Sequence, residues 1–323
     1  MRIGVIGGGA WGTALAQVAA ANGEPVILWA RETDVVTAIN LAHENTVFLP
    51  NVPLSPSIQA TGELDDLAGC DALLLVTPAQ HLRSVLMDLP QGHHPLVLCA
   101  KGIEAGTKSL MSDVAGELRA GSPIAVLSGP TFAAEVARGL PTAVTLACTD
   151  ESLCRALSQR LARPTFRPYA SDDVAGAEIG GAVKNVLAIA CGVVAGRGLG
   201  ENARAALIAR GFAEMVRYGV ARGGRAETLS GLSGLGDLVL TCSSTASRNF
   251  SLGVGLGAGK EAASLMEGNT VAEGAFTAPV LQASARELGV TMPVVDAVCA
   301  LLEGQDVDAV VGDLLARPLR GEQ

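Results

Sequence analysis

The sequence predicts an α/β fold in two parts, a doubly wound sheet over residues 1–173 and an all-α domain over residues 174–323. As far as about Tyr169, short aliphatic and β-branched runs alternate with helical stretches, a pattern typical of βαβ units and a parallel sheet. Beyond Ser171 this alternation gives way to long alanine- and leucine-rich stretches separated by proline and glycine. A chain of 323 residues is long enough for two such domains.

The positions of the elements follow from the same patterns. Strand runs such as DALLLVTP are apolar on both faces, as a sheet covered by helices on both sides requires. We expect strands at residues 3–6, 26–29, 72–76, 96–99, 124–127, 143–146 and 165–167. We expect helices at residues 13–22, 80–89, 110–119, 132–138, 151–163, 174–195 and 202–218.

Composition narrows the classes of partner. The formal net charge is −9 and neither sign is gathered into a long run, so we expect a small-molecule partner and no nucleic acid. The seven cysteines are widely spaced, with no C-x-x-C pair and no neighbouring histidine to complete a zinc site. We therefore expect reduced, buried thiols, no metal and a cytoplasmic location.

Two apolar segments resemble membrane or export signals. The N-terminal MRIGVIGGGAWGTALA has a basic start and a small-residue end, but three consecutive glycines would break a signal helix, so we reject that interpretation. The longest apolar stretch is interrupted by Lys184, Asn185 and glycines, and we expect no transmembrane helix there.

The motif GGGAWG directly follows the first expected strand. In such a G-x-G-x-x-G, Gly7 allows the tight turn, Gly9 lets the backbone approach a pyrophosphate, and Gly12 permits close helix–strand packing. Because the motif lies between a strand and a helix, we expect a Rossmann-type dinucleotide site. After the second strand, Arg31 favours the 2′-phosphate of NADP(H), whereas the adjacent Glu32 leaves NAD(H) open.

Lysine is scarce, and one of the four lysines lies in an apolar segment. Lys184 is the sole charge between Ile179 and Gly196. An amine can release a proton near neutral pH where a guanidinium cannot, so Lys184 is our first candidate for an acid or base. All four histidines lie in the first half, which leaves lysine as the proton donor of the second. The alternative is a lysine whose stem lies along a buried helix with its head in water.

Polar residues follow two further strands at the edge where a doubly wound sheet binds ligands. Lys101 comes after one buried strand and faces substrate, cofactor phosphate or solvent. Gly129 and Thr131 come after the next, where the glycine allows a close backbone approach. The Thr131 hydroxyl either reaches a ligand or, with Glu135, begins the following helix.

The second half contains two more polar groups. Asp237 is a lone acid in a glycine-dense stretch, which indicates either backbone held close to a ligand or a helix-packing corner. Ser247, Arg248 and Asn249 combine a bidentate cation with a hydroxyl and an amide, a grouping that suits a phosphate. A helix cap beside a surface arginine is the alternative.

Over essentially its full length the chain closely resembles the bacterial NAD(P)-dependent sn-glycerol-3-phosphate dehydrogenases. The motifs that carry the resemblance are GGGAWGTALA, CAKGIE, LSGPTFAAEVARGLPTA, EIGGAVKNVLAIACG, GLSGLGDLVLTCSSTASRN and VAEG. The resemblance implies reversible hydride transfer between NAD(P)H and dihydroxyacetone phosphate, giving sn-glycerol 3-phosphate for phospholipid synthesis. It also implies a homodimer.

The resemblance further assigns residues. Lys184 matches the catalytic lysine that protonates the carbonyl oxygen, and Asp237 matches the acid that orients its ammonium. The implied substrate site comprises Lys101, Gly129, Thr131, Lys184, Asn185, Asp237, Ser247, Arg248 and Asn249, with Arg248 as the phosphate clamp. The implied cofactor contacts beyond the motif glycines are Ala10, Trp11, Arg31, Ala133, Val271 and Glu273, with Lys101 and Arg248 also in reach.

Two other functions remain open from the residues alone. A different 2- or 3-hydroxy acid dehydrogenase would share the dinucleotide site and a catalytic lysine, but would need a carboxylate clamp in place of a phosphate site. A nucleotide-sensing regulator would bind NADP(H) and turn nothing over, and the presence of Lys184, Lys101 and Asp237 in a lysine-poor chain argues against it.

Overall fold

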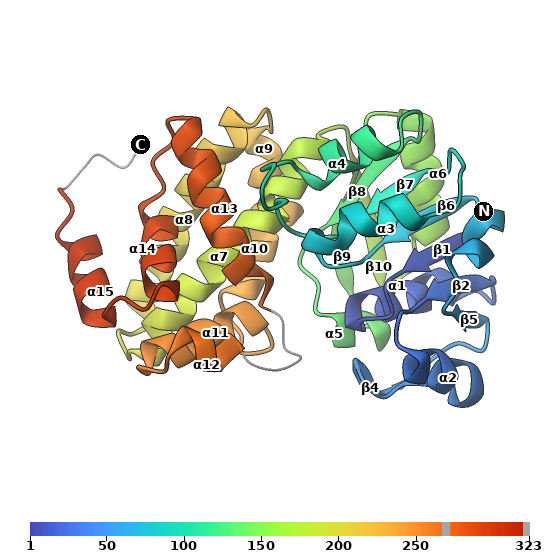
Figure 1. The fold of residues 1–323 in the computed structure, drawn as a ribbon, viewed down its shortest axis with the longest axis horizontal. Coiled ribbons are helices and arrows are strands. Elements are labelled where there is room, and N and C mark those ends of the chain that lie inside the picture. Colours follow the sequence, from blue (N-terminus) through green and yellow to red (C-terminus); the bar gives the residue numbers. More distant parts are fainter. Residues whose placement is uncertain (267–271, 319–323) are drawn as a thin grey trace.

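The computed structural model describes residues 1–266 and 272–318, and its two halves lie side by side along the long axis of the molecule (Figure 1). The N-terminal half contains a large sheet with helices, and the C-terminal half is helical. The predicted fold class is therefore confirmed. The long helix α7 (Val174–Gly196) begins the helical half and contacts strands β8 and β9 of the sheet, so it links the two halves.

Within the described residues the large sheet has eight strands in the order β10-β9-β8-β7-β6-β1-β2-β5. Every predicted strand is present. The strands of this sheet are β1 (Ile3–Ile6), β2 (Val26–Trp29), β5 (Ile58–Thr61), β6 (Ala72–Leu75), β7 (Leu96–Leu98), β8 (Ile124–Ser128), β9 (Thr142–Cys148) and β10 (Phe166–Ser171). The central strand β1 pairs with β2 on one side, Ile3 opposite Val26, and with β6 on the other, Ile3 opposite Ala72.

The sheet is mixed, which corrects the prediction of a parallel sheet. β8 and β9 are antiparallel, and β10 runs parallel to β9, so β9 and β10 run opposite to the other six strands of the sheet. The cause is the short connection from β8 to β9, whose only helix is α5 (Ala133–Ala137). Five helical residues rise about 7.5 Å, which is too little to return along a five-residue strand of about 16 Å. The chain therefore begins β9 at the same end of the sheet at which β8 finishes.

Helices cover both faces of this sheet. On β1, Ile3 and Val5 pack into one core with α1 and α6, whereas Ile6 faces a second core with α3 and α4. The helices of this half are α1 (Ala10–Ala20), α2 (Thr33–Ala42), α3 (Leu82–Asp88), α4 (Met111–Leu118), α5 and α6 (Glu151–Leu161), with short 3₁₀ turns η1 (Leu64–Gly69) and η2 (Ala79–His81). Sequence analysis gave no element between residues 30 and 71, where the structure has α2, β5, and the hairpin of β3 (Glu44–Asn45) and β4 (Leu49–Pro53).

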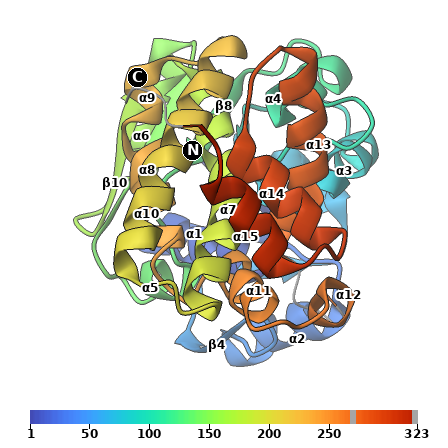
Figure 2. The same ribbon diagram turned by 90° about the vertical axis from the view of Figure 1, so that its left-hand side faces the viewer.

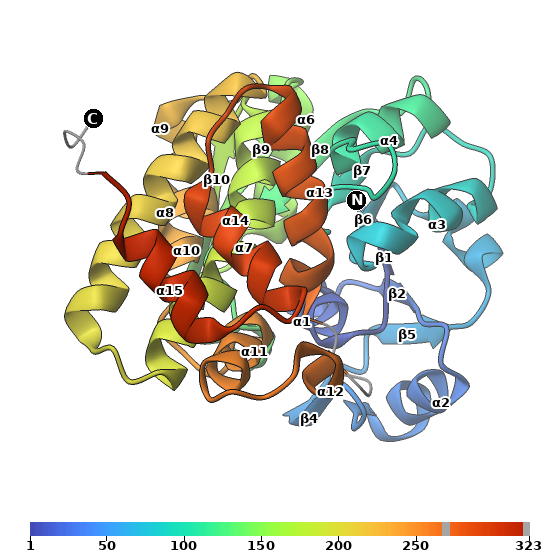
Figure 3. The same ribbon diagram turned by 60° about the vertical axis from the view of Figure 1, so that its left-hand side comes forward.

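The helical half is built around α7, which is buried along almost its whole length. Helices α8, α10, α11, α13 and α14 contact it, and Figure 3 shows α13 and α14 beside it. The elements of this half are α8 (Glu201–Ala221), α9 (Ala226–Leu229), the π-helical turn η3 (Leu232–Gly236), α10 (Asp237–Thr241), α11 (Arg248–Gly257), α12 (Ala262–Met266), α13 (Glu273–Glu287), α14 (Pro293–Leu302) and α15 (Val307–Leu315). In Figure 2, α15 lies nearest the viewer, at the end of the molecule away from the sheet.

Helix α7 is the one described helix whose length and mean hydropathy, 1.7 over 18 residues, match a membrane span. Within the protein, however, 89% of that segment is buried. Glycines let its neighbours approach closely, since a Cβ on Gly192 would lie 2.1 Å from the carbonyl oxygen of Phe250 in α11. The apolar faces of α7 are thus covered by other helices of the same chain.

Candidate active site

The glycine motif forms the turn from β1 into α1. Gly7 has φ +126°, a conformation that favours glycine, and a Cβ on Gly12 would lie only 1.9 Å from the Gly7 carbonyl oxygen. Gly9 is different: it precedes the first turn of α1, and no atom lies within 4 Å of the position its Cβ would take. The backbone N–H groups at the start of α1 are therefore open to an anionic group, as a dinucleotide pyrophosphate requires.

Asn45, a residue that sequence analysis missed, stabilises this turn through hydrogen bonds from a separate hairpin. The fully buried Asn45 of β3 donates from Nδ2 to the Gly8 carbonyl oxygen and to Thr13 Oγ1, both at 2.8 Å. Its Oδ1 accepts a hydrogen bond from the Phe48 backbone N–H at 3.1 Å. No local pattern announces this contact, because the hairpin that carries Asn45 is irregular and joins the turn only in the folded chain.

The other predicted cofactor residues surround the same turn. Ala10 and Trp11 form the first turn of α1, and the buried Trp11 Nε1 has no hydrogen-bond partner among the described residues. Ala133 begins α5, which packs against α1. Arg31 follows β2 with its side chain 79% exposed, and its guanidinium pairs with Glu32 at 3.1 Å. Val271 lies outside the described residues.

Two lysines share one buried carboxylate between the halves. Lys184 Nζ in α7 donates to Asp237 Oδ1 at 2.7 Å, and Lys101 Nζ donates to Asp237 Oδ2 at 2.6 Å. Asp237 is fully buried, and the side chains of Lys184 and Lys101 are 9% and 14% exposed. Lys184 also donates to Thr241 Oγ1 at 2.8 Å, a contact that sequence analysis missed although Thr241 lies one turn after Asp237. The alternative of a lysine head in water is thereby excluded.

Burial sets the proton affinity of Lys184. Desolvation lowers the pKa of Lys184 from 10.5 to about 8, the carboxylate of Asp237 opposes this, and the nearby charge of Lys101 adds to the lowering. An amine with a pKa near 8 exchanges its proton close to physiological pH, as a general acid or base requires.

Glycine packing brings Asp237 to this position. A Cβ on Gly180 of α7 would lie 2.4 Å from the Ser233 carbonyl oxygen, and one on Gly234 would lie 1.9 Å from that of Leu229. The turn η3 therefore lies directly on α7, and α10 begins at Asp237 beside Lys184. The packing-corner interpretation of this segment is therefore confirmed, and the corner places Asp237 beside Lys184. The other interpretation, backbone held close to a ligand, stays a prediction.

The Ser247–Asn249 group lies at the start of α11 and adjoins α13. Ser247 Oγ caps α11 by accepting the Phe250 N–H at 3.2 Å, and Asn249 Oδ1 accepts the Gly274 N–H at 2.9 Å. Arg248 is exposed. Burial raises the pKa of Glu273, and the positive charges of Arg248, Lys101 and Lys184 oppose that rise. These residues, far apart in sequence, are thus gathered near the two lysines.

Gly129 and Thr131 adjoin Lys101 on the sheet side. The Gly129 carbonyl oxygen accepts from Lys101 Nζ at 3.3 Å and from Thr131 Oγ1 at 3.2 Å. Gly129 has φ +155°, and a Cβ there would lie 2.9 Å from Val144 Cα. The prediction that Thr131 begins the helix is wrong, because Phe132 precedes α5 and no side chain caps it. Asn185, next to Lys184, is buried.

The comparisons with known proteins agree with this geometry. Two family profiles match, "NAD-dependent glycerol-3-phosphate dehydrogenase N-terminus" at residues 2–154 and the corresponding "C-terminus" at residues 173–311. Proteins named glycerol-3-phosphate dehydrogenase (NAD(P)+) from Erythrobacter litoralis and Sphingopyxis alaskensis are 63% and 61% identical to this chain, each covering 99% of it and 98% of the relative. The crystal structure of glycerol-3-phosphate dehydrogenase from Coxiella burnetii superposes with a TM-score of 0.93 at 39% identity, covering 98% of this chain and 99% of that one.

Proposed function

Because this chain belongs to the NAD-dependent glycerol-3-phosphate dehydrogenase family, we propose that it reversibly converts dihydroxyacetone phosphate into sn-glycerol 3-phosphate. Bound NAD(P)H supplies the hydride that reduces the ketone. The observation that carries the proposal is the buried cluster in which Lys184 of α7 and Lys101 of the sheet half both bind Asp237 of α10. In a cell the product would enter glycerophospholipid synthesis.

Lys184 is the proposed general acid. As the carbonyl carbon is reduced, its oxygen gains negative charge, and the Lys184 ammonium transfers a proton to that oxygen. In the reverse direction the neutral amine takes the proton back. Asp237 and Thr241 accept hydrogen bonds from the Lys184 nitrogen at 2.7 and 2.8 Å, and these two bonds restrict its movement.

The charge balance favours a phosphorylated substrate. Two lysines on a single carboxylate leave one positive charge uncompensated within the cluster. Arg248 supplies a second positive charge and a planar guanidinium that can bind phosphate through two hydrogen bonds, so we assign it as the clamp. Gly129, Thr131, Asn185, Ser247 and Asn249 complete the proposed substrate site.

The glycine turn is the proposed cofactor site. Gly7, Gly9 and Gly12 shape it, and the open space at Gly9 supports a close approach of the pyrophosphate. Ala10, Trp11, Arg31, Lys101, Ala133, Arg248 and Glu273 are the further proposed contacts. We also propose residues 1–173 and 174–323 as the two domains, a homodimeric assembly and a cytoplasmic location.

The test is oxidation of NADPH and NADH by purified protein, with and without dihydroxyacetone phosphate, in wild type and Lys184→Ala. We expect substrate-dependent oxidation that falls by a factor of about 10²–10⁴ in the variant, the usual loss for an acid/base group. Activity that survives Lys184→Ala would contradict the assigned proton donor. Cofactor binding without turnover of any triose phosphate would instead favour the sensor hypothesis.

A further inference from the structure

Lys101 lies on a segment that has little regular structure of its own. Between β7 and α4, residues 99–110 form loops and turns, joined by a single bridge between Ile103 and Leu110. Yet Lys101 reaches across to Asp237, 136 residues away, at 2.6 Å. A long, flexible side chain on such a segment needs external support to keep this position, because ordering it costs conformational entropy.

The first support is Gln80 in η2. Its Nε2 donates to the Ile103 carbonyl oxygen at 2.8 Å, and its Oε1 accepts the Ala105 N–H at 2.9 Å. The side-chain amide thus pairs with the segment as a neighbouring strand would. Contact is close here, since a Cβ on Gly102 would lie 2.7 Å from the Ala79 side chain.

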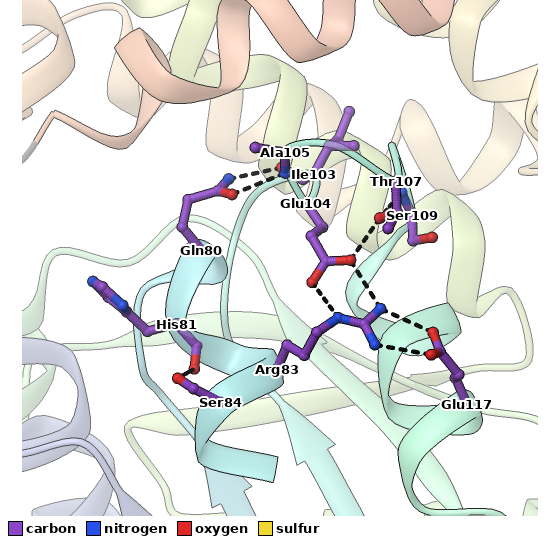
Figure 4. Close-up of polar contacts among 10 residues, drawn as sticks. All are labelled: Gln80, His81, Arg83, Ser84, Ile103, Glu104, Ala105, Thr107, Ser109 and Glu117. Carbon is purple, nitrogen blue, oxygen red and sulfur yellow. Dashed lines mark hydrogen bonds and ion pairs between the residues drawn. The ribbon is translucent and has the colours of Figure 1, made fainter. Parts of the chain in front are cut away.

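The second support is Arg83 in α3. Its Nε and Nη2 bind the two oxygens of Glu104 at 2.8 and 3.0 Å, and Thr107 Oγ1 donates to the same carboxylate at 2.5 Å. The other edge of the guanidinium binds Glu117 of α4 at 2.9 and 2.8 Å. Figure 4 shows the guanidinium lying between the two carboxylates, and Gln80 apart from it, paired with Ile103 and Ala105. Both pairs are bidentate, the strong geometry for arginine.

The two carboxylates differ in what they attach. The Glu104 side chain is only 11% exposed and belongs to the Lys101 segment, whereas that of Glu117 is 60% exposed and lies on α4. Arg83 lowers the pKa of Glu104, so this pair is ionised at neutral pH. Loss of Arg83 would leave Glu104 charged and partly buried without its partner. Loss of Glu117 would leave the Arg83–Glu104 pair in place.

The position of Lys101 matters for Lys184. Asp237 from α10, Glu273 from α13, Lys101, and the Cys242 thiol just after α10 are the titratable groups that interact with Lys184. Among them Lys101 lowers the pKa of Lys184 and also occupies one oxygen of Asp237. If Lys101 withdrew, Asp237 would attract Lys184 alone.

We propose that Arg83 and Gln80 are positioning residues that hold Lys101 on Asp237 and so keep the two lysines on one carboxylate. They act through the Lys101 segment and touch neither the lysines nor Asp237. This inference rests on the proposed function, because it assigns a catalytic consequence to the Lys101 position.

The experiment compares Arg83→Gln and Gln80→Ala with Glu117→Gln as the matched control from the same polar cluster. For each purified protein, kcat and KM for dihydroxyacetone phosphate are measured across pH, together with the Kd of NADH and the thermal unfolding midpoint. We expect kcat/KM to fall about tenfold or more in the first two variants, the loss of roughly one positioned interaction. In these two variants the fall of kcat/KM at high pH should begin at a higher pH than in wild type. Their Kd for NADH, and the kcat/KM of Glu117→Gln, should stay within about twofold of wild type.

A double-mutant cycle separates positioning from a general loss of structure. In a Lys101→Met background, Arg83→Gln should reduce kcat/KM by less than about twofold, because its effect passes through Lys101. The inference would be overturned if Arg83→Gln lowered kcat/KM equally with and without Lys101. It would also be overturned if the kcat/KM of Arg83→Gln equalled that of Glu117→Gln. If Arg83→Gln does not fold, Gln80→Ala decides by the same criteria. An inactive wild type would instead count against the proposed function.

Discussion

The two halves of this protein contribute to the site by different physical means. The sheet half offers backbone, in a turn where Gly7 and Gly12 are required by geometry and Gly9 faces open space. The helical half offers buried side-chain charge, with Lys184 and Asp237 held on packed helices. The first arrangement leaves backbone N–H groups open to an anionic group, and the second lowers the pKa of Lys184. Substitutions in the two halves should therefore fail in different ways.

Carboxylates show the same contrast. In the sheet half, Arg83 lowers the pKa of Glu104 and Glu117. In the helical half, burial raises the pKa of Glu178 and of Glu214 to about 7 each. Glu178 accepts hydrogen bonds from the Ser112 N–H, at 2.9 Å, and from its hydroxyl, which hold α7 against α4 of the sheet half. Glu104 and Glu117 are thus stabilised as charges, whereas burial favours the protonated forms of Glu178 and Glu214.

The largest expected effect separates two glycines of one turn. Gly12→Ala places a methyl group against the Gly7 carbonyl oxygen. We therefore expect the unfolding free energy to fall by about 3 kcal/mol or more, and cofactor binding to be lost as well. Gly9→Ala meets no protein atom, so its stability should be unchanged while NADPH affinity falls by about 1–3 kcal/mol. Denaturant unfolding and fluorescence titration measure the two quantities. A destabilised Gly9→Ala protein would remove the distinction.

Next in size is the pH dependence of stability from Glu178. Its folded pKa of about 7 exceeds the ordinary 4.5, so burial favours the protonated form. The stability that this group contributes is fully present below pH 4.5 and is lost as the pH rises to about 7. The unfolding free energy should fall by about 3 kcal/mol over this range, since one pKa unit corresponds to about 1.4 kcal/mol.

Glu178→Gln should remove that part of the slope when the unfolding free energy is compared at pH 5 and pH 8. Glu151→Gln is the control, because the Glu151 side chain is 87% exposed. An unchanged slope in Glu178→Gln would show that the folded protein does not raise the pKa of this carboxyl.

The protonation of Lys184 should make the reaction rate depend on pH. Beyond the pKa, the rate should change about tenfold per pH unit, which corresponds to about 1.4 kcal/mol. Reduction needs the protonated amine, so kcat/KM for dihydroxyacetone phosphate should fall as pH rises through about 8. Oxidation of sn-glycerol 3-phosphate needs the neutral amine and should rise over the same range. A reduction rate that stays flat from pH 7 to pH 10 would contradict this role for Lys184.

The smallest expected effect concerns Arg31. With 79% of its side chain exposed, its interaction with a 2′-phosphate is screened by water and is worth about 1 kcal/mol or less. Arg31→Ala should therefore raise KM for NADPH a few-fold, about fivefold at most, and leave KM for NADH unchanged. Glu32→Gln should shift the ratio of the two KM values in the opposite direction. An unchanged ratio in Arg31→Ala would exclude Arg31 as a determinant of cofactor preference.

Where sequence analysis succeeded, the signal was local. The strand β1, the glycine turn and the buried helix α7 each follow from patterns within about 25 consecutive residues. It failed where short elements lack a pattern, as for β3, whose Asn45 holds the glycine turn. It also missed the reversed strand β9, because strand direction depends on the length of helix in the connection and not on the strand's own residues.

By itself the sequence determined that Lys184 would be the lone charge on a long apolar helix, because no other charged residue lies between Ile179 and Gly196. Whether its amine would be buried or reach water was left open. Only the tertiary structure decided that this amine would share Asp237 with Lys101. The residues of these two ion pairs lie 53 and 136 positions apart, so no periodicity connects them. Their distances result from glycines that let η3 lie on α7, and from Arg83 and Gln80, which pin the Lys101 segment to the sheet half.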